Sequence, residues 1–358
     1  MIEKTLTERG CAMVKKIGID LGYANIAVCD VTQDVFREPS VALIHKNSRA
    51  GEPRIISIGN EAFGAGQGAA AEGMLVRPFK NGMFFDHQIT EEVITRVIEA
   101  HKGNADKLRC VIGVPSDILT KQEKDLFSML QNAGVATSYS VVRPVAAIIG
   151  AGYSPNMSVI SVNIGAMSTE IAVMHGGKAV YLSRTEIGGE DFDKAVRQFV
   201  LEQGDVNISL SVARAIKERL GAVWKGRPND SIDIEGTLAL TGNRLKMNVS
   251  TEDIVGVFEK PMQDLIYAII DAVKKVPLDS VEAVFENGIV LTGGGAELYG
   301  IDILLARVLG ISVTKPQTPI DCVAKGLARI NAFIQGKSRG GSKNITDQLA
   351  RLYNESRK

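Results

Sequence analysis

Three observations on this sequence predict an α/β fold made of two related halves. Apolar strand-like segments alternate with amphipathic helix-like segments, which is typical of layered α/β proteins. The segments IGIDLGYANIAV at 17–28 and ISVNIGAMSTEIAV at 160–173 share one plan, in which a strand, a glycine turn and a returning strand follow one another. The chain has 358 residues, enough for two cores. We therefore expect two related α/β domains that face each other across a cleft.

The order of these segments predicts the domain boundaries. The first half has expected strands in KIGIDLG, ANIAVCDV, SVALIH, RIISIG and RCVIGVP, and expected helices in ITEEVITRVIEAH and KQEKDLFSMLQNAG. The second half has strands in MSVISVNIG, STEIAVM, KAVYLSRTEIGG and NGIVLTGGG, with helices expected at 190–202, 210–220, 251–276 and from about 298. We expect an N-terminal extension at 1–14, domains at 15–150 and 151–335, and a basic flexible tail at 336–358.

Composition excludes several classes of protein. Forty-one basic residues balance forty-one acidic residues, so the net charge predicts neither a nucleic-acid partner nor a membrane surface. No apolar run approaches the roughly 20 residues that cross a bilayer, and the N-terminus resembles no signal peptide, so we expect a cytoplasmic location. The cysteines are too dispersed for a metal site and are expected to be reduced thiols; they are Cys11, Cys29, Cys110 and Cys322.

The two matched turns are candidate phosphate sites. In each, an apolar strand ends in a polar residue, Asp20 or Asn163, and a glycine follows two positions later, Gly22 or Gly165. Glycine beside short side chains lets backbone N–H groups approach a phosphate oxygen. One turn alone would suit an ordinary β-hairpin, but a pair suggests a clamp for β- and γ-phosphates, with Asp20 holding Mg²⁺ through water.

Two further segments are candidates for the nucleoside. The loop LTGGGAELYG at 291–300 follows a strand and enters a helix, so consecutive glycines could pass close to a base, a ribose or an α-phosphate. A plain helix-entry loop is the alternative interpretation. In IKERL at 216–220, Lys217 and Glu218 are neighbours on a predicted helix, where a solvated charge pair is the usual explanation.

Together these segments resemble the actin superfamily, and in particular its bacterial MreB/MamK branch. EPSVALI, VRPFKNGMFFDHQITEEVI, AAIIGAG and GIVLTGGGAELYGID occur in that order, and the resemblance runs from about residue 16 to 334. It implies an actin-like fold, ATP and Mg²⁺ as cofactors, a C-terminal helix that crosses back to the first domain, and Lys217 and Glu218 flanking the adenosine. The residues that the resemblance assigns to the nucleotide are Asp20, Gly22, Tyr23, Ala24, Asn25, Gly165, Ala166, Met167, Ser168, Gly189, Glu190, Lys217, Glu218, Gly293, Gly294, Gly295 and Ala296.

Three positions depart from the pattern of this branch. Tyr23 stands where the branch generally has threonine, and Asn163 stands where the superfamily has aspartate. Arg143 stands where MreB proteins have a glutamate thought to orient the attacking water. An amide brings no charge to Mg²⁺ and a guanidinium accepts no proton, so we expect ATP binding with slow or lost hydrolysis. An active site rewired around Arg143, acting as an arginine finger does, is the alternative.

The resemblance also implies self-association into filaments. The segment KGNADKLR at 102–109, where MreB proteins commonly have an apolar membrane loop, is polar here, so we expect no direct membrane insertion. This favours a MamK-like cytoplasmic filament that positions magnetosomes. The alternatives are an MreB-type cell-shape protein and a ParM-like DNA-segregating filament. Another bacterial actin or a cargo adaptor is the expected further partner.

Three other classes fit less well. A sugar or acetate kinase of the same superfold needs a carboxylate base at the second turn, where this chain has Asn163. A chaperone would carry a peptide-binding region after the ATPase domain, and only a short basic segment follows residue 335. A membrane adaptor of the FtsA type would end in a more apolar helix than TDQLARLYNESRK.

Overall fold

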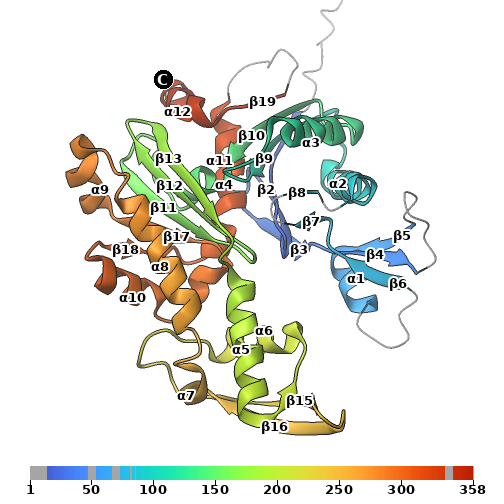
Figure 1. Cartoon of the computed structure of the whole chain (residues 1–358). Helices are drawn as coiled ribbons and strands as arrows, with labels where there is room; N and C mark the ends of the chain where they lie inside the picture. Colours follow the sequence, from blue (N-terminus) through green and yellow to red (C-terminus); the bar gives the residue numbers. More distant parts are fainter. Residues whose placement is uncertain are drawn as a thin grey trace, which may run out of the picture.

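The computed structural model describes residues 14–46, 54–66, 73–80, 83–84, 86–334 and 342–357. Two large sheets lie on either side of a central pair of helices, and a smaller group of elements extends from each sheet (Figure 1). The N-terminal extension expected at 1–14 lies outside the described residues, except that Val14 already begins the first strand.

The first large sheet belongs to the first half of the chain. β1 lies inside this sheet, where it pairs in antiparallel with β2 on one side and in parallel with β9 on the other. In spatial order its strands are β19 (Lys343–Asn344), β10 (Thr137–Val142), β9 (Lys107–Val114), β1 (Val14–Leu21), β2 (Asn25–Asp30) and β3 (Val35–Pro39).

The second large sheet repeats this plan. β11 pairs in antiparallel with β12 and in parallel with β17, as β1 does with β2 and β9. Its strands, in spatial order, are β13 (Lys178–Thr185), β12 (Thr169–His175), β11 (Val159–Ile164), β17 (Ile289–Thr292) and β18 (Val313–Thr314). The two halves inferred from the repeated strand-turn-strand motif are therefore confirmed as two related sheets.

Each half carries a smaller subdomain. In the first half the described parts are β4 (Ala42–His45), β5 (Ile55–Ile58), β6 (Gly73–Val76), α1 (Gly59–Ala65) and the pair β7 (Phe79–Lys80) and β8 (Met83–Phe84). In the second half they are α5 (Gly189–Gly204), α6 (Leu210–Leu220), α7 (Thr251–Ile254), β14 (Val206–Asn207), β15 (Ser231–Leu238) and β16 (Arg244–Ser250).

Helices cover the sheets and bury two main apolar cores, one in each half. The remaining helices are α2 (His87–Lys102), α3 (Thr120–Asn132), α8 (Glu259–Val273), α9 (Val281–Asn287), α10 (Ile301–Leu309) and the short 3₁₀ turns η1 (Leu278–Ser280), η2 (Gly294–Glu297), η3 (Pro319–Asp321) and η4 (Thr346–Gln348). The single helix predicted at 251–276 is wrong, because α7 and α8 are separate. Pro261 lies in the first turn of α8, where its missing N–H costs no helical hydrogen bond.

Two helices join the halves at the centre of the molecule, α4 (Arg143–Gly150) and α11 (Cys322–Phe333). Both helices lie between the two sheets (Figure 1), and they cross closely because each has a glycine at the contact. A Cβ on Gly150 would lie 1.7 Å from the carbonyl oxygen of Cys322, and one on Gly326 would lie 1.8 Å from that of Ala146. α11 packs on β1 of the first sheet, and α4 packs on β11 of the second. The last helix of the predicted second domain therefore lies on the first sheet.

The flexible tail expected at 336–358 is a prediction that the structure contradicts for residues 342–357. β19 extends the first sheet by pairing with β10, and α12 (Leu349–Ser356) packs beside α11. Ile345 and Leu349 are each 1% exposed, and the rings of Tyr353 and Phe333 make an edge contact. The prediction relied on the basic composition of the tail and overlooked Ile345 and Leu349, two apolar residues four positions apart. Their burial holds the segment against the rest of the protein. No helix in the described ranges is long and apolar enough to cross a membrane.

Candidate functional site

A cavity of about 410 Å³ lies between the two halves. This volume is within the range of small-molecule sites in proteins. Both glycine turns, the triple-glycine loop and helices α4, α5 and α6 supply its walls. The predicted site residues that line it are Asp20, Gly22, Tyr23, Ala24, Asn25, Arg143, Asn163, Gly165, Ala166, Met167, Ser168, Gly189, Lys217, Glu218, Gly293, Gly294 and Gly295.

The two glycine turns have the same hydrogen bond. The N–H of Gly22 donates to the carbonyl of Asn25 over 3.0 Å, and the N–H of Gly165 donates to that of Ser168 over 2.8 Å. The intervening amides of the two turns, at 23–24 and 166–167, make no hydrogen bond within the described part of the chain. A backbone N–H without a protein acceptor at the edge of a cavity is available to an anion.

The triple-glycine loop runs directly against the second turn. Gly293 has φ +83°, and a Cβ there would lie 2.3 Å from the carbonyl oxygen of Ile164. Only glycine fits this combination of positive φ and close backbone approach. The loop therefore brings the carboxyl end of β17 next to that of β11, and Gly294 and Gly295 line the same cavity as the turn.

The register of β11 and β12 places a carboxylate that the sequence reasoning missed. Glu170 lies directly opposite Asn163 in this antiparallel pair, so both side chains reach the same face. Asn163 is 7% exposed, and its Oδ1 accepts a hydrogen bond from the Thr292 hydroxyl at 3.2 Å. Glu170 is 3% exposed and lines the cavity. The signal that could have found it is the one charged residue of the segment TEIAVM, directly before the apolar run IAVM.

Arg143 reaches into the cavity from the first residue of α4. α4 begins directly after β10, and Pro144 is suited to the first turn of a helix. This start places Arg143 close to the end of β1. The Arg143 Nε lies 3.0 Å from Asp20 Oδ1, and its Nη1 lies 3.2 Å from Glu170 Oε1. Burial lowers the pKa of Arg143, but the negative charges of Glu170 and Asp20 outweigh this and raise the pKa above its ordinary value.

Both carboxylate oxygens of Glu170 contact donors of the protein. Its Oε2 accepts hydrogen bonds from both the backbone N–H and the hydroxyl of Ser116, each at 2.9 Å. Its Oε1 faces Arg143. Three donors, two from Ser116 and one from Arg143, therefore hold the Glu170 carboxylate in place.

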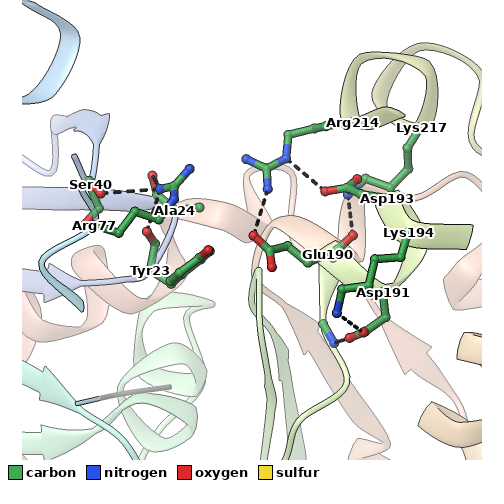
Figure 2. A network of polar contacts seen from close by, with 12 residues as sticks. Tyr23, Ala24, Ser40, Arg77, Glu190, Asp191, Asp193, Lys194, Arg214 and Lys217 are labelled. Atoms are coloured by element: carbon green, nitrogen blue, oxygen red, sulfur yellow. Dashed lines mark hydrogen bonds and ion pairs between the residues drawn. The ribbon is translucent and has the colours of Figure 1, made fainter. Parts of the chain in front are cut away.

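A second charge network forms the wall between α5 and α6 (Figure 2). Asp193 of α5 is fully buried, and its two oxygens contact Lys217 Nζ at 2.7 Å and Arg214 Nε at 3.1 Å. Lys217 also donates to the carbonyl of Gly189 at 2.9 Å. Three charged residues near the cavity were not predicted, because their contacts join separate helices and loops; they are Asp193, Arg214 and Arg227.

The opposite wall holds Tyr23, one of the three departures from the family pattern. The guanidinium of Arg77 stacks over its ring at 4.7 Å and donates to its carbonyl oxygen at 2.9 Å. Tyr23 and Glu190, from the two halves, come near each other across the cavity mouth (Figure 2). Burial first, and then the charge of Glu190, raise the pKa of Tyr23, so its hydroxyl stays neutral.

Two predicted residues do not line the cavity. Glu190 lies at its edge, with an oxygen 3.8 Å from Arg214 Nη2. Ala296 is fully buried in η2, so it packs beneath the triple-glycine loop. The other predicted positions are brought together, although they are spread from residue 20 to residue 295.

The residues present do not fit a magnesium ion at Asp20. Mg²⁺ requires near-octahedral oxygen ligands, usually one or two carboxylates together with phosphates and waters. Here the guanidinium of Arg143 is bound to both carboxylates at the turns, and Asn163 adds no charge. Among the described residues, no group of three histidine, cysteine or acidic side chains could hold a metal ion.

Comparisons with known proteins agree with this arrangement. The family model described as "MreB/Mbl protein" matches residues 14–338. The cell shape-determining protein MreB of Escherichia coli K12 is 30% identical over 320 residues, which cover 87% of this chain and 91% of that protein. The cell shape-determining protein Mbl of Bacillus cereus is 29% identical over 318 residues, covering 87% and 94%.

Solved structures show the same fold. MreB5 of Spiroplasma citri, bound to ADP, superposes with a TM-score of 0.81 at 20% identity, covering 87% of this chain and 94% of that one. A MamK double helical filament gives a TM-score of 0.75 at 23% identity, covering 88% and 98%. With the family match over most of the chain and two matched halves around one cavity, this protein belongs to the MreB/Mbl family of bacterial actins.

Proposed function

We propose that this chain is an ATP-binding filament protein of the MreB type that hydrolyses ATP slowly. The observation that carries the proposal is the meeting of two phosphate-type turns and a glycine loop at one cavity between related halves. The two turns suit the β- and γ-phosphates, because their amides at 23–24 and 166–167 point to no protein acceptor in the described chain. Relatives of this fold bind ADP and AMPPNP, which supports an adenine nucleotide.

The family supports self-association of this chain into filaments. MamK, which has the same fold, forms a double helical filament. In a two-domain fold of this kind, a ligand that bridges both halves favours a closed cleft, and closure changes the surfaces available for end-to-end contact. We propose that this chain polymerises in the cytoplasm with itself, and that another bacterial actin or an adaptor provides further contacts.

A cell-shape role is better supported than magnetosome positioning. The named relatives that match in sequence are cell shape-determining proteins, whereas the likeness to MamK is one of fold. The observation that still favours a MamK-type role is the loop after α2, where Gly103, Asn104 and Asp106 are exposed and the small Ala105 between them is intermediate in exposure. The expected ParM-like role gains no support from the matched family.

Electron microscopy of negatively stained, purified protein tests the filament proposal. We expect filaments with ATP and with a non-hydrolysable analogue, and fewer or none with ADP or without nucleotide. Filaments that form equally in all four conditions would refute a nucleotide-linked assembly. Absence of filaments in every condition, including with a crowding agent, would refute self-assembly of this chain alone.

Phosphate release tests the slow-hydrolysis part. The double variant Asn163→Asp, Arg143→Glu restores two carboxylates at the phosphate end of the cavity, where general-base and metal-linked chemistry need them. We expect this variant to release phosphate faster than the wild type. Wild-type turnover equal to or above that of the variant would refute slow hydrolysis and favour a site rewired around Arg143.

A further inference from the structure

Arg143 lies where the two halves meet, between one carboxylate from each. Asp20 is the second-last residue of β1 in the first sheet and Glu170 lies on β12 of the second, and the guanidinium contacts both. A third bond runs from Nη2 to the carbonyl of Leu21 at 2.9 Å. The arginine side chain is 12% exposed and lines the cavity. One fixed positive charge therefore bridges two acidic groups at the floor of the site.

This guanidinium and a divalent ion at Asp20 would compete for the same carboxylate. Oδ1 of Asp20 accepts from Arg143 Nε at 3.0 Å, and a dication beside it would also face the guanidinium charge. Arginine stays protonated at any physiological pH, so the competition cannot be relieved by loss of a proton. Glu170 offers no alternative ligand, because Ser116 and Arg143 already occupy its two oxygens.

The site retains enough donors to bind phosphate without a metal. A guanidinium has five N–H donors, and the three bonds to Asp20, Glu170 and Leu21 leave about two for a phosphate oxygen. The amides at 23–24 and 166–167 add four more N–H groups on the two facing turns. Arginine is well suited to phosphate, since its planar fork can make two parallel hydrogen bonds.

We propose that Arg143 is the resident cation of the phosphate site, and that this protein binds nucleotide without a divalent metal ion. The inference rests on the proposed nucleotide-binding function and goes beyond it. It also accounts for the contact of Arg143 with both Asp20 and Glu170 in a site whose second turn carries the uncharged Asn163. The guanidinium offsets one of the two carboxylate charges, whereas a divalent ion would offset both, and through its two contacts it links the two halves.

Binding of a fluorescent ATP analogue to the full chain, in excess Mg²⁺ and in excess EDTA, tests the proposal. We expect wild-type Kd values within about threefold of each other in the two buffers. In Arg143→Ala, which exposes both carboxylates, we expect binding to become at least about tenfold tighter with Mg²⁺ than with EDTA. Arg143→Lys keeps the charge and should remain metal-independent. Arg219→Ala, an arginine paired with Asp230 outside the cavity, is the matched control and should behave as wild type.

A direct count of bound metal separates the outcomes. Electron paramagnetic resonance of Mn²⁺, added in place of Mg²⁺ with saturating nucleotide, should show no protein-bound ion in wild type and about one per chain in Arg143→Ala. Wild-type binding that requires Mg²⁺, or one tightly bound Mn²⁺ per wild-type chain, would overturn the proposal and leave nucleotide binding intact. No binding in either buffer would overturn both. If Arg143→Ala does not fold, the wild-type comparison of the two buffers still decides.

Discussion

Replacing Gly326 by alanine perturbs the contact between α4 and α11 at a single atom. The new Cβ would lie 1.8 Å from the carbonyl oxygen of Ala146 and 2.9 Å from the backbone nitrogen of Gly150. Non-bonded heavy atoms rest at roughly 3.5 Å, so the two helices must separate by more than about 1 Å. Both neighbours are backbone atoms of a helix, and no side-chain rotation can relieve the clash.

The size of the effect follows from two opposing terms. Overpacking of this kind costs about 1–3 kcal/mol of unfolding free energy. The higher helix propensity of alanine adds back about 0.8–1.0 kcal/mol of unfolding free energy relative to glycine. The difference between the two contributions is about 0–2 kcal/mol, and because this clash is with backbone atoms we expect the upper half of that range, a net loss of about 1–2 kcal/mol. At roughly 2–4 °C per kcal/mol for domains of 150–250 residues, Tm falls by about 2–8 °C.

Differential scanning calorimetry of the purified variants measures this shift. Gly64→Ala is the matched control, since it adds the same atom in a helix, α1, where a Cβ meets nothing within 4 Å. We expect the control to match or exceed the wild-type Tm. If Gly326→Ala is as stable as Gly64→Ala, then the helices do not cross at this glycine and the reasoning is refuted.

Three further predictions concern a buried charge, the C-terminal segment and two thiols. Asp193→Asn leaves two cations without their buried partner, so about 3–5 kcal/mol of unfolding free energy should be lost in urea denaturation; a loss below 1 kcal/mol would contradict the network. Leu349→Ala should cost about 2–4 kcal/mol, whereas Leu240→Ala, at a position 90% exposed, should stay within about 0.5; equal effects would contradict the docking of α12. Burial raises the pKa of Cys29 and Cys322 to about 11. Between an ordinary thiol pKa of about 8.5 and that value, the unfolded chain loses both protons while the folded state keeps them. The free energy of unfolding should therefore be highest below about pH 8.5 and fall as the pH rises to about 11. The fall in Tm over this window should be shallower when both cysteines are replaced by alanine, and an unchanged pH profile would contradict it.

The sequence by itself determined the local features of this protein. Alternating apolar segments predicted most strands, and α6 at 210–220 has the expected bounds. The repeated strand-turn-strand motif predicted two related sheets. Most candidate residues of the cavity were also found, because glycine turns next to strand ends carry their signal within a few consecutive residues.

The tertiary structure alone decided which charges meet. Asp193, Arg214 and Lys217 come from two helices, and Arg143 contacts carboxylates at positions 20 and 170, so no local pattern predicts either network. The docking of residues 342–357 was missed for the same reason, since two apolar side chains give little signal in a basic segment until a partner surface buries them. Sequence periodicity records which face of an element is apolar, whereas the pairing of charges depends on distances that only packing sets.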